Sequence, residues 1–258
     1  MFCMTTPQIV WLDLQPSLAG FNCRLAKKLS QSRIVKRWSF HHDPDEACTI
    51  ETVQDYLCES ISHSEFNRPH VIAHGTSGTI ACMLACEQPK LFRSLTLLSV
   101  DSNTANHWTS HYHTIRQQLP CSREQILVHL SSLLFDIKGS KLCHATTKIL
   151  EKCLDFDFVL SSILSNTSKG YLQKPPIPTM VINGNYDFVV DQNAHSRWKQ
   201  ILQPGDCYHN IDQGRHFFHF HNSDDIAKKI NAFLDMIPLD STYKTGNFDS
   251  SPTFKVFS

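Results

Sequence analysis

The chain has 258 residues, with 24 lysines and arginines, 24 aspartates and glutamates and a formal net charge of zero at pH 7. A neutral chain has no long-range field to attract nucleic acid or an anionic membrane, and no apolar run reaches the roughly 18 residues of a transmembrane segment. Residues 1–7 are too short and too polar for a signal peptide, so we expect a soluble cytoplasmic protein.

Strands alternate with helices through the first hundred residues. Hydrophobic periodicity predicts strands at 8–12, 33–40, 70–73 and 94–100, and helices at 18–29, 49–61 and, after the third strand, up to about residue 86. Strands separated by single helices imply right-handed crossovers and a parallel sheet. The fold class is therefore α/β, with a mostly parallel, doubly wound sheet.

The alternation breaks between residues 102 and 176. This part shows helical patterns at 122–135, 143–153 and 156–164 and no convincing strand. It is either a cap over one end of the sheet or a set of further helices that cover the sheet. The run Pro175-Pro176-Ile177-Pro178 closes it as a stiff linker.

The sheet pattern resumes at 177–237. It predicts strands at 179–182 and 207–211 and helices at 193–202 and 224–236. We therefore divide the chain into an N-terminal core part (1–101), a helical insertion (102–176), a C-terminal core part (177–237) and a flexible tail (238–258).

The ten cysteines show no Cys-x-x-Cys spacing. Cys82 and Cys86 lie four residues apart on one predicted helix, and Cys23, Cys58 and Cys153 lie in apolar helical stretches. We expect reduced, buried thiols that pack as small hydrophobes, as in an intracellular protein.

Residues 71–78 read Val-Ile-Ala-His-Gly-Thr-Ser-Gly and lead from a strand into a helix. This segment resembles the strand, sharp turn and helix that present the nucleophile in the α/β-hydrolase family. When the strand end is aligned, Ala73, His74 and Gly75 fill the positions of the motif, and Gly75 stands where the family has its nucleophilic serine.

Two later segments extend the resemblance to residues 8–236. Residues 177–187 end in Gly184-Asn185-Tyr186-Asp187 and look like the family's late strand with the acid of the catalytic triad. Residues 214–218, Gly-Arg-His-Phe-Phe, look like the loop that carries the catalytic histidine. The resemblance thus implies the α/β-hydrolase fold with a helical cap, Asp187 as the acid and His216 as the histidine.

The nucleophile and the oxyanion loop depart from the family pattern. Glycine cannot attack a substrate, and Ser77 is either a displaced nucleophile or a polar group at the start of a helix. The first predicted strand ends in Asp13-Leu14, where the family has His-Gly before its oxyanion loop. A carboxylate at this point would repel a developing oxyanion.

A dyad of His216 and Asp187 remains, and it has two interpretations. It can act as a general base without a covalent step, as in hydrolase-fold enzymes thought to work this way, or it can be an inherited pair that ties two loops together. Asp101, directly after the fourth strand, is an alternative partner for His216. Asp13, His74, Thr76 and Asp101 are expected to line a ligand pocket at the same end of the sheet, next to the elbow residues Gly75 and Ser77.

Three further patterns favour simple interpretations. The histidines of residues 216–221 lack further ligands at metal spacing, and the glycines at 75 and 78 lack the lysine of a phosphate-binding loop, so we expect no metal and no cofactor. The cluster His107-Trp108 and His111-Tyr112-His113 either lines a pocket or packs on the sheet.

Two functions follow as hypotheses. The first is a hydrolase, or a lyase or oxygenase derived from one, that uses His216 and Asp187 on a small organic substrate without serine chemistry. The second is a noncatalytic protein that binds a small molecule in the capped pocket or a protein partner.

Overall fold

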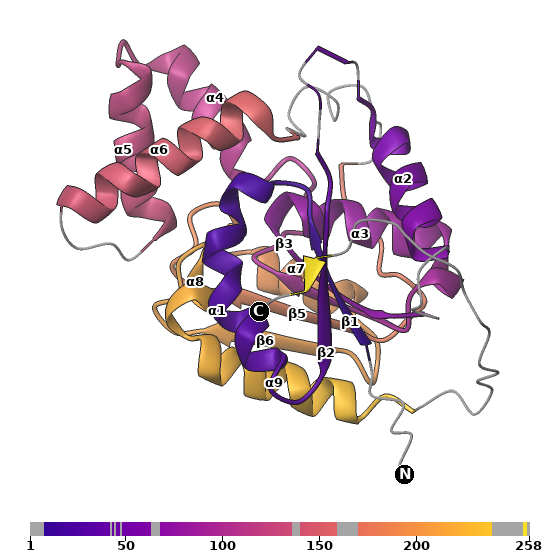
Figure 1. Cartoon of the computed structure of the whole chain (residues 1–258). Coiled ribbons are helices and arrows are strands. Elements are labelled where there is room, and N and C mark those ends of the chain that lie inside the picture. The colour runs from indigo at the N-terminus through magenta and orange to yellow at the C-terminus, as the bar shows by residue number, and fades with distance from the viewer. Residues whose placement is uncertain are drawn as a thin grey trace.

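The computed structural model describes residues 8–41, 43, 45–46, 48–62, 68–135, 140–158, 170–238 and 255–256. Within these residues seven strands form one sheet in the order β6-β5-β4-β3-β1-β2-β7 (Figure 1). The strands are β1 (Gln8–Asp13), β2 (Ile34–Ser39), β3 (His70–His74), β4 (Ser94–Leu98), β5 (Thr179–Gly184), β6 (Cys207–Ile211) and β7 (Lys255–Val256). Strands β1 to β6 run parallel, which confirms the predicted parallel α/β sheet.

Strand β7 is a feature that the sequence pattern does not predict. It pairs antiparallel with β2 through Lys36 and Arg37. It also is the part of the chain after residue 238 that the structure describes, so the expectation of a flexible tail otherwise falls outside the described residues.

The order of the strands reverses at β1. From β1 the chain passes to β2 on one side and then to β3 on the other, so the carboxyl ends of β1 and β3 are neighbours. Their register pairs Leu12 with Ala73, which places Asp13 beside the end of β3. Open α/β sheets bind ligands outside such a reversal.

Helices cover both faces of the sheet (Figure 1). One face packs on α1 (Ala19–Leu29) and α9 (Ser223–Asp235), and the other packs on α2 (Ile50–Ser62), α3 (Gly75–Glu87) and α7 (Ala194–Ile201). Strand β1 serves both layers, because successive side chains of a strand point to opposite faces. Its inward-facing side chains are Ile9 and Trp11 on the first face and Val10 and Leu12 on the second.

The segment between β4 and β5 is helical, as the sequence predicts. It forms α4 (Trp108–Gln118), α5 (Arg123–Leu134) and α6 (Ser140–Phe156), which lie together beyond the start of α1 in Figure 1. Its described residues form no strand beyond an isolated bridge between Asn103 and Tyr171. The sequence pattern predicts a helix at 156–164. In the structure α6 ends at Phe156, residues 157 and 158 are not helical, and residues 159–164 lie outside the described part.

Three short helices complete the described elements. They are η1 (Pro16–Leu18), η2 (Pro89–Leu91) and α8 (Phe218–His221). Within the described residues, no helix has the length and apolar character that a membrane crossing requires.

Within the described residues, the cysteines form no disulfide. Cys82 and Cys153 are buried, as expected. The expectation is wrong for Cys23, which is exposed. Phe21, Leu25 and Ala26 carry the buried face of α1, and the helical period turns Cys23 away from them.

Candidate functional site

The turn between β3 and α3 has the geometry of a sharp elbow. Gly75 is the first residue of α3 and has φ of +51°, in the left-handed region that favours glycine. A Cβ atom at this position would lie 3.4 Å from Nε2 of His216. The apex of the elbow therefore faces the imidazole directly and carries no side chain.

His216 and Asp187 form a buried hydrogen-bonded pair. The distance from His216 Nδ1 to Asp187 Oδ2 is 2.9 Å, and the two side chains are 1% and 0% exposed. Because the carboxylate oxygen accepts this bond, Nδ1 of the neutral imidazole carries the proton and Nε2 presents a lone pair toward Gly75. The other carboxylate oxygen of Asp187 accepts bonds from the backbone N–H groups of Val189 and Val190, at 2.9 and 3.3 Å.

Two glycines let the loops that carry this pair approach each other. An added Cβ on Gly184, at the end of β5, would lie 2.1 Å from the carbonyl oxygen of Gly214. No larger residue fits this crossing. The N–H of Tyr186 donates to the same carbonyl at 2.9 Å, which fixes the acid loop on the histidine loop.

The backbone of His216 is fixed from two sides. Its carbonyl oxygen accepts hydrogen bonds from the hydroxyl of Ser99 at 2.6 Å and from Nε2 of His74 at 2.9 Å. Burial, with the neighbouring His216 and His219, holds the pKa of His74 well below its usual range. His74 is thus a neutral donor that supports the position of His216.

Ser77 points away from the apex of the elbow. Its Oγ accepts a hydrogen bond from the backbone N–H of Leu14 at 2.9 Å, and the residue is buried. This bond ties the first turn of α3 to the end of β1. Of the two alternatives that the sequence leaves open, the geometry matches a polar group at the start of a helix.

Two backbone N–H groups in the loop after β1 are hydrogen-bonded to side chains of the protein. Leu14 donates to Ser77, and the N–H of Gln15 donates to Oδ1 of Asp13 at 3.3 Å. Burial raises the pKa of Asp13 to about 7, against the opposing effect of Arg37. Among the described residues, neither Oδ2 of Asp13 nor the buried hydroxyl of Thr76 has a hydrogen-bond partner.

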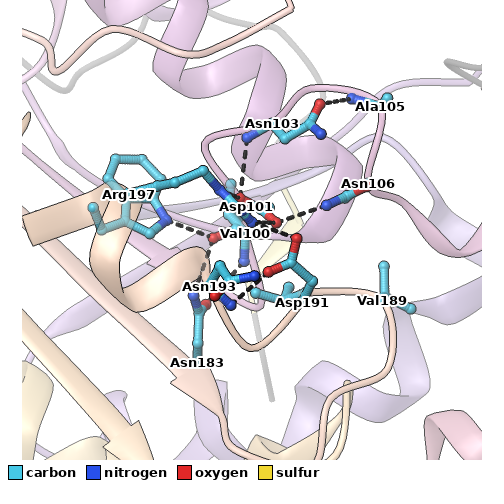
Figure 2. Close-up of polar contacts among 12 residues, drawn as sticks. Val100, Asp101, Asn103, Ala105, Asn106, Asn183, Val189, Asp191, Asn193 and Arg197 are labelled. Carbon is cyan, nitrogen blue, oxygen red and sulfur yellow. Dashed lines mark hydrogen bonds and ion pairs between the residues drawn. The ribbon is translucent and has the colours of Figure 1, made fainter. Parts of the chain in front are cut away.

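Asp101 belongs to a separate ion-pair network (Figure 2). Its two oxygens accept a fork of hydrogen bonds from Nε and Nη2 of Arg197, at 3.0 and 2.5 Å, and Asn106 donates to it at 2.7 Å. Arg197 also pairs with Asp191 at 2.8 Å. The alternative that Asp101 is the partner of His216 is therefore wrong, because the guanidinium occupies its oxygens and Asp187 holds the imidazole.

Helix α4 brings two more histidines toward the pair. His107 caps this helix through Nδ1, which accepts from the N–H of Ser110 at 3.2 Å, and burial lowers the pKa of His107 to about 4. His111 lies one turn later, with its ring centroid 5.1 Å from that of Phe188. Burial also lowers the pKa of His111, whose charge would interact with those of His216 and Asp187.

Part of the histidine cluster at 107–113 is thus buried in the core, and His111 lies against Phe188, next to Asp187. Trp108 and Tyr112 are buried, whereas Nε2 of His111 is enclosed with no partner among the described residues. The sequence pattern places His111 in this cluster but does not distinguish it from its neighbours. Its spacing of four from His107, which puts both on one helix face, is the signal that would have found it.

The histidines at 216 and 219 have different partners. His216 faces Asp187, whereas Nε2 of His219 bonds with Oδ1 of Asn22 at 2.9 Å. Within the described residues no three metal-binding side chains come together.

Comparison with known proteins gives relatives without an assigned activity and solved structures of enzymes. No family model matches the chain. It is 31% identical to the uncharacterized protein alr2406 of Nostoc sp., over 88% of this chain and 90% of the relative, and 29% identical to the uncharacterized protein sll0249 of Synechocystis sp., over 87% and 89%.

Two solved structures illustrate the shared fold. A meta-cleavage product hydrolase from Pseudomonas fluorescens is 12% identical with a TM-score of 0.64, and the match covers 89% of this chain and 90% of that one. A carboxylesterase from Bacillus subtilis is 10% identical with a TM-score of 0.67, over 90% and 84%. At such identities the likeness concerns the fold alone.

Proposed function

Because the chain has the α/β-hydrolase fold and belongs to the same family as alr2406, we propose that it is an enzyme whose His216, oriented by Asp187, acts as a general base on a small organic substrate. The reaction has no covalent serine step. The observation that carries this proposal is the lone pair of His216 Nε2, which faces the bare apex at Gly75. In a serine hydrolase that space would hold the nucleophile.

Two features argue against conventional ester hydrolysis. The apex has no oxygen, and loss of the nucleophile leaves serine enzymes only about 10³–10⁴-fold acceleration over water. The backbone N–H groups of Leu14 and Gln15, in the loop after β1, are already bonded within the protein, so neither is a free donor for a tetrahedral oxyanion.

In the proposed reaction His216 takes up one proton and later returns it. Nε2 of His216 takes a proton from an O–H or C–H group of the substrate, or from water, and the imidazolium that results is stabilised by the Asp187 carboxylate. The proton returns from Nε2 to the product. A positioned base of this kind contributes typically about 10²–10⁴-fold in rate.

We further propose that residues 102–176 form a cap over this site. Three contacts support it: the N–H of Phe217 donates to the carbonyl of Leu134, Arg215 donates to the carbonyl of Ser132, and Phe217 packs in one cluster with α4, α5 and α6. The helical segment is thereby attached to the loop that carries His216. A small-molecule ligand would bind beneath it.

We also place the protein in the cytoplasm. Within the described residues no cysteine forms a disulfide, although Cys82 and Cys86 lie one helical turn apart. Free thiols persist in a reducing compartment.

The experiment compares wild type, His216→Ala and the matched control His221→Ala, an exposed histidine of the same segment. Each is screened against generic esters and acidic aromatic compounds. Turnover that falls about 10²-fold or more in His216→Ala and is unchanged in His221→Ala supports the proposal. Equal turnover in wild type and His216→Ala contradicts it.

A noncatalytic binding protein is the second candidate, and the missing nucleophile favours it. Ligand or partner binding by wild type, without any turnover in the screen, would support that candidate.

A further inference from the structure

The ring of His111 has a buried nitrogen that nothing in the described structure uses. Nε2 is enclosed without a hydrogen-bond partner, and the ring lies against Phe188, the residue after Asp187. A buried polar atom left unpaired costs about 1–3 kcal/mol, so such an atom next to a candidate active site points to a ligand.

The protonation of His111 follows from its other contact. The backbone of Val189 acts to raise the pKa of the His111 imidazole, which is the effect of a carbonyl beside a ring N–H. Because Nε2 has no partner, Nδ1 is the donor. In the neutral ring Nε2 then holds a lone pair and can only accept a hydrogen bond.

The site thus presents two lone pairs of the same kind. Nε2 of His216 faces the elbow, and Nε2 of His111 lies on α4, where the His111 ring packs against Phe188, next to Asp187. The hydroxyl of Thr76, directly after the apex, is a further buried group with no partner among the described residues. Acceptors of this kind match O–H donors on a ligand.

Two arginines of the described residues are already engaged within the protein. Arg197 is held by Asp101 and Asp191, and Arg215 donates to the carbonyls of Ser132 and Leu133. A carboxylate or phosphate bound beside His216 would lose water without gaining either of these arginines as a free charged partner. A neutral molecule with hydroxyl groups loses less hydration free energy on binding.

We propose that the substrate is a neutral organic molecule with at least two hydroxyl groups, one of which gives its proton to His216 while the other donates a hydrogen bond to Nε2 of His111. This rests on the proposed general-base function. The step breaks one O–H bond of the substrate and forms the N–H bond at His216 Nε2, which leaves an oxyanion on the substrate and an imidazolium on the protein, with no change of oxidation state. His111 positions the molecule and sets its specificity.

The test uses two probes that differ by one hydroxyl, 4-nitrocatechol and 4-nitrophenol, at a pH at which both are neutral in solution. Absorbance titration reports both affinity and ionisation, because the ionised probes absorb at longer wavelength. Wild type is compared with His111→Ala, His111→Gln, His216→Ala and the control His113→Ala, an exposed histidine of the same helix. Thermal unfolding shows which variants are folded.

We expect wild type and His113→Ala to bind 4-nitrocatechol in its ionised form and more tightly than 4-nitrophenol. His111→Ala should weaken 4-nitrocatechol roughly fivefold to tenfold and leave 4-nitrophenol unchanged, with partial recovery in His111→Gln, which retains an acceptor. His216→Ala should lose the ionised spectrum.

Three results would overturn the inference. A preference for 4-nitrocatechol that survives in His111→Ala removes His111 from the site while leaving the general base intact. A bound probe that stays neutral in wild type contradicts the general base whatever His111 does. Failure of wild type to bind 4-nitrocatechol contradicts the substrate class.

Discussion

Nε2 of His216 lies 3.4 Å from the point that a Cβ atom of Gly75 would occupy. This distance is an ordinary van der Waals contact, so the elbow has room for a side chain and the imidazole is in place to activate one. The backbone at Gly75 has the left-handed φ of a sharp elbow, yet the residue there supplies no oxygen. At this elbow the imidazole of His216 therefore faces a residue that has no oxygen.

Restoring the hydroxyl should restore serine reactivity. Wild type should not react with a fluorophosphonate, whereas Gly75→Ser should be labelled at residue 75, slowly because the loop amides at Leu14 and Gln15 are already bonded. Mass spectrometry of the labelled peptide identifies the site. Gly75→Ala is the control, since it has the same backbone strain, about 1–2 kcal/mol, and no hydroxyl. Labelling of wild type at Ser77 would show that the elbow has been assigned to the wrong residue.

Much of the fold follows from local sequence pattern. Strands β1 and β3 to β5 are short apolar runs, and the alternation of strands and helices from β1 to β4 predicts a parallel sheet. The position of Gly75 follows from the same pattern, because the end of β3 fixes which residue stands at the turn. Asp187 and His216 were placed by motif and order along the chain, and the crossing of Gly184 and Gly214 explains how those motifs meet.

Contacts between residues far apart in the chain could not be predicted from local sequence pattern. Asp101 follows β4 just as a catalytic acid could, and only the fold shows that Arg197, which lies 96 residues later, occupies its oxygens. His111 stands in a helix whose pattern allows several orientations. Its approach to Phe188 depends on how the helical segment packs, which no local periodicity encodes.

Ser77 should matter for stability. Ser77→Ala leaves the buried N–H of Leu14 without an acceptor, at a cost of about 1–3 kcal/mol in the free energy of unfolding. Urea denaturation measures this loss. The control Ser132→Ala removes a hydroxyl that is exposed and bonds within its own helix, so it should change stability by less than about 0.5 kcal/mol. Equal effects of the two substitutions would contradict the role of the Ser77 bond.

Asp13 should make the protein less stable as the pH rises. Its pKa is about 7 when folded and 3.8 in its ordinary state, so between these values the folded protein binds the extra proton. The stabilising effect is complete below about pH 3.8, is lost as the pH rises to about 7, and reaches on the order of 4 kcal/mol if the whole difference is expressed.

Asp13→Asn tests this dependence, because the amide cannot ionise. Its stability relative to wild type should rise between about pH 4 and pH 7, as measured by urea denaturation across that range. Asp212→Asn, which changes an exposed carboxyl, should run parallel to wild type. A constant difference between Asp13→Asn and wild type over the range would show that Asp13 is ionised throughout.

Arg197 should be needed for the stability of the fold, because it neutralises the buried carboxylate of Asp101. The Asp101 side chain is 0% exposed and bonds with Arg197 through both oxygens, so Arg197→Leu leaves an unpaired buried charge and should cost about 3–5 kcal/mol in the free energy of unfolding. Adding Asp101→Asn to Arg197→Leu should recover part of the loss, because the charge is then absent. Lys148→Leu, which breaks an exposed pair with Glu151, should cost less than about 1 kcal/mol. A double variant as unstable as the sum of the two single variants would mean that Asp101 and Arg197 stabilise the loop independently and that the pair between them contributes little.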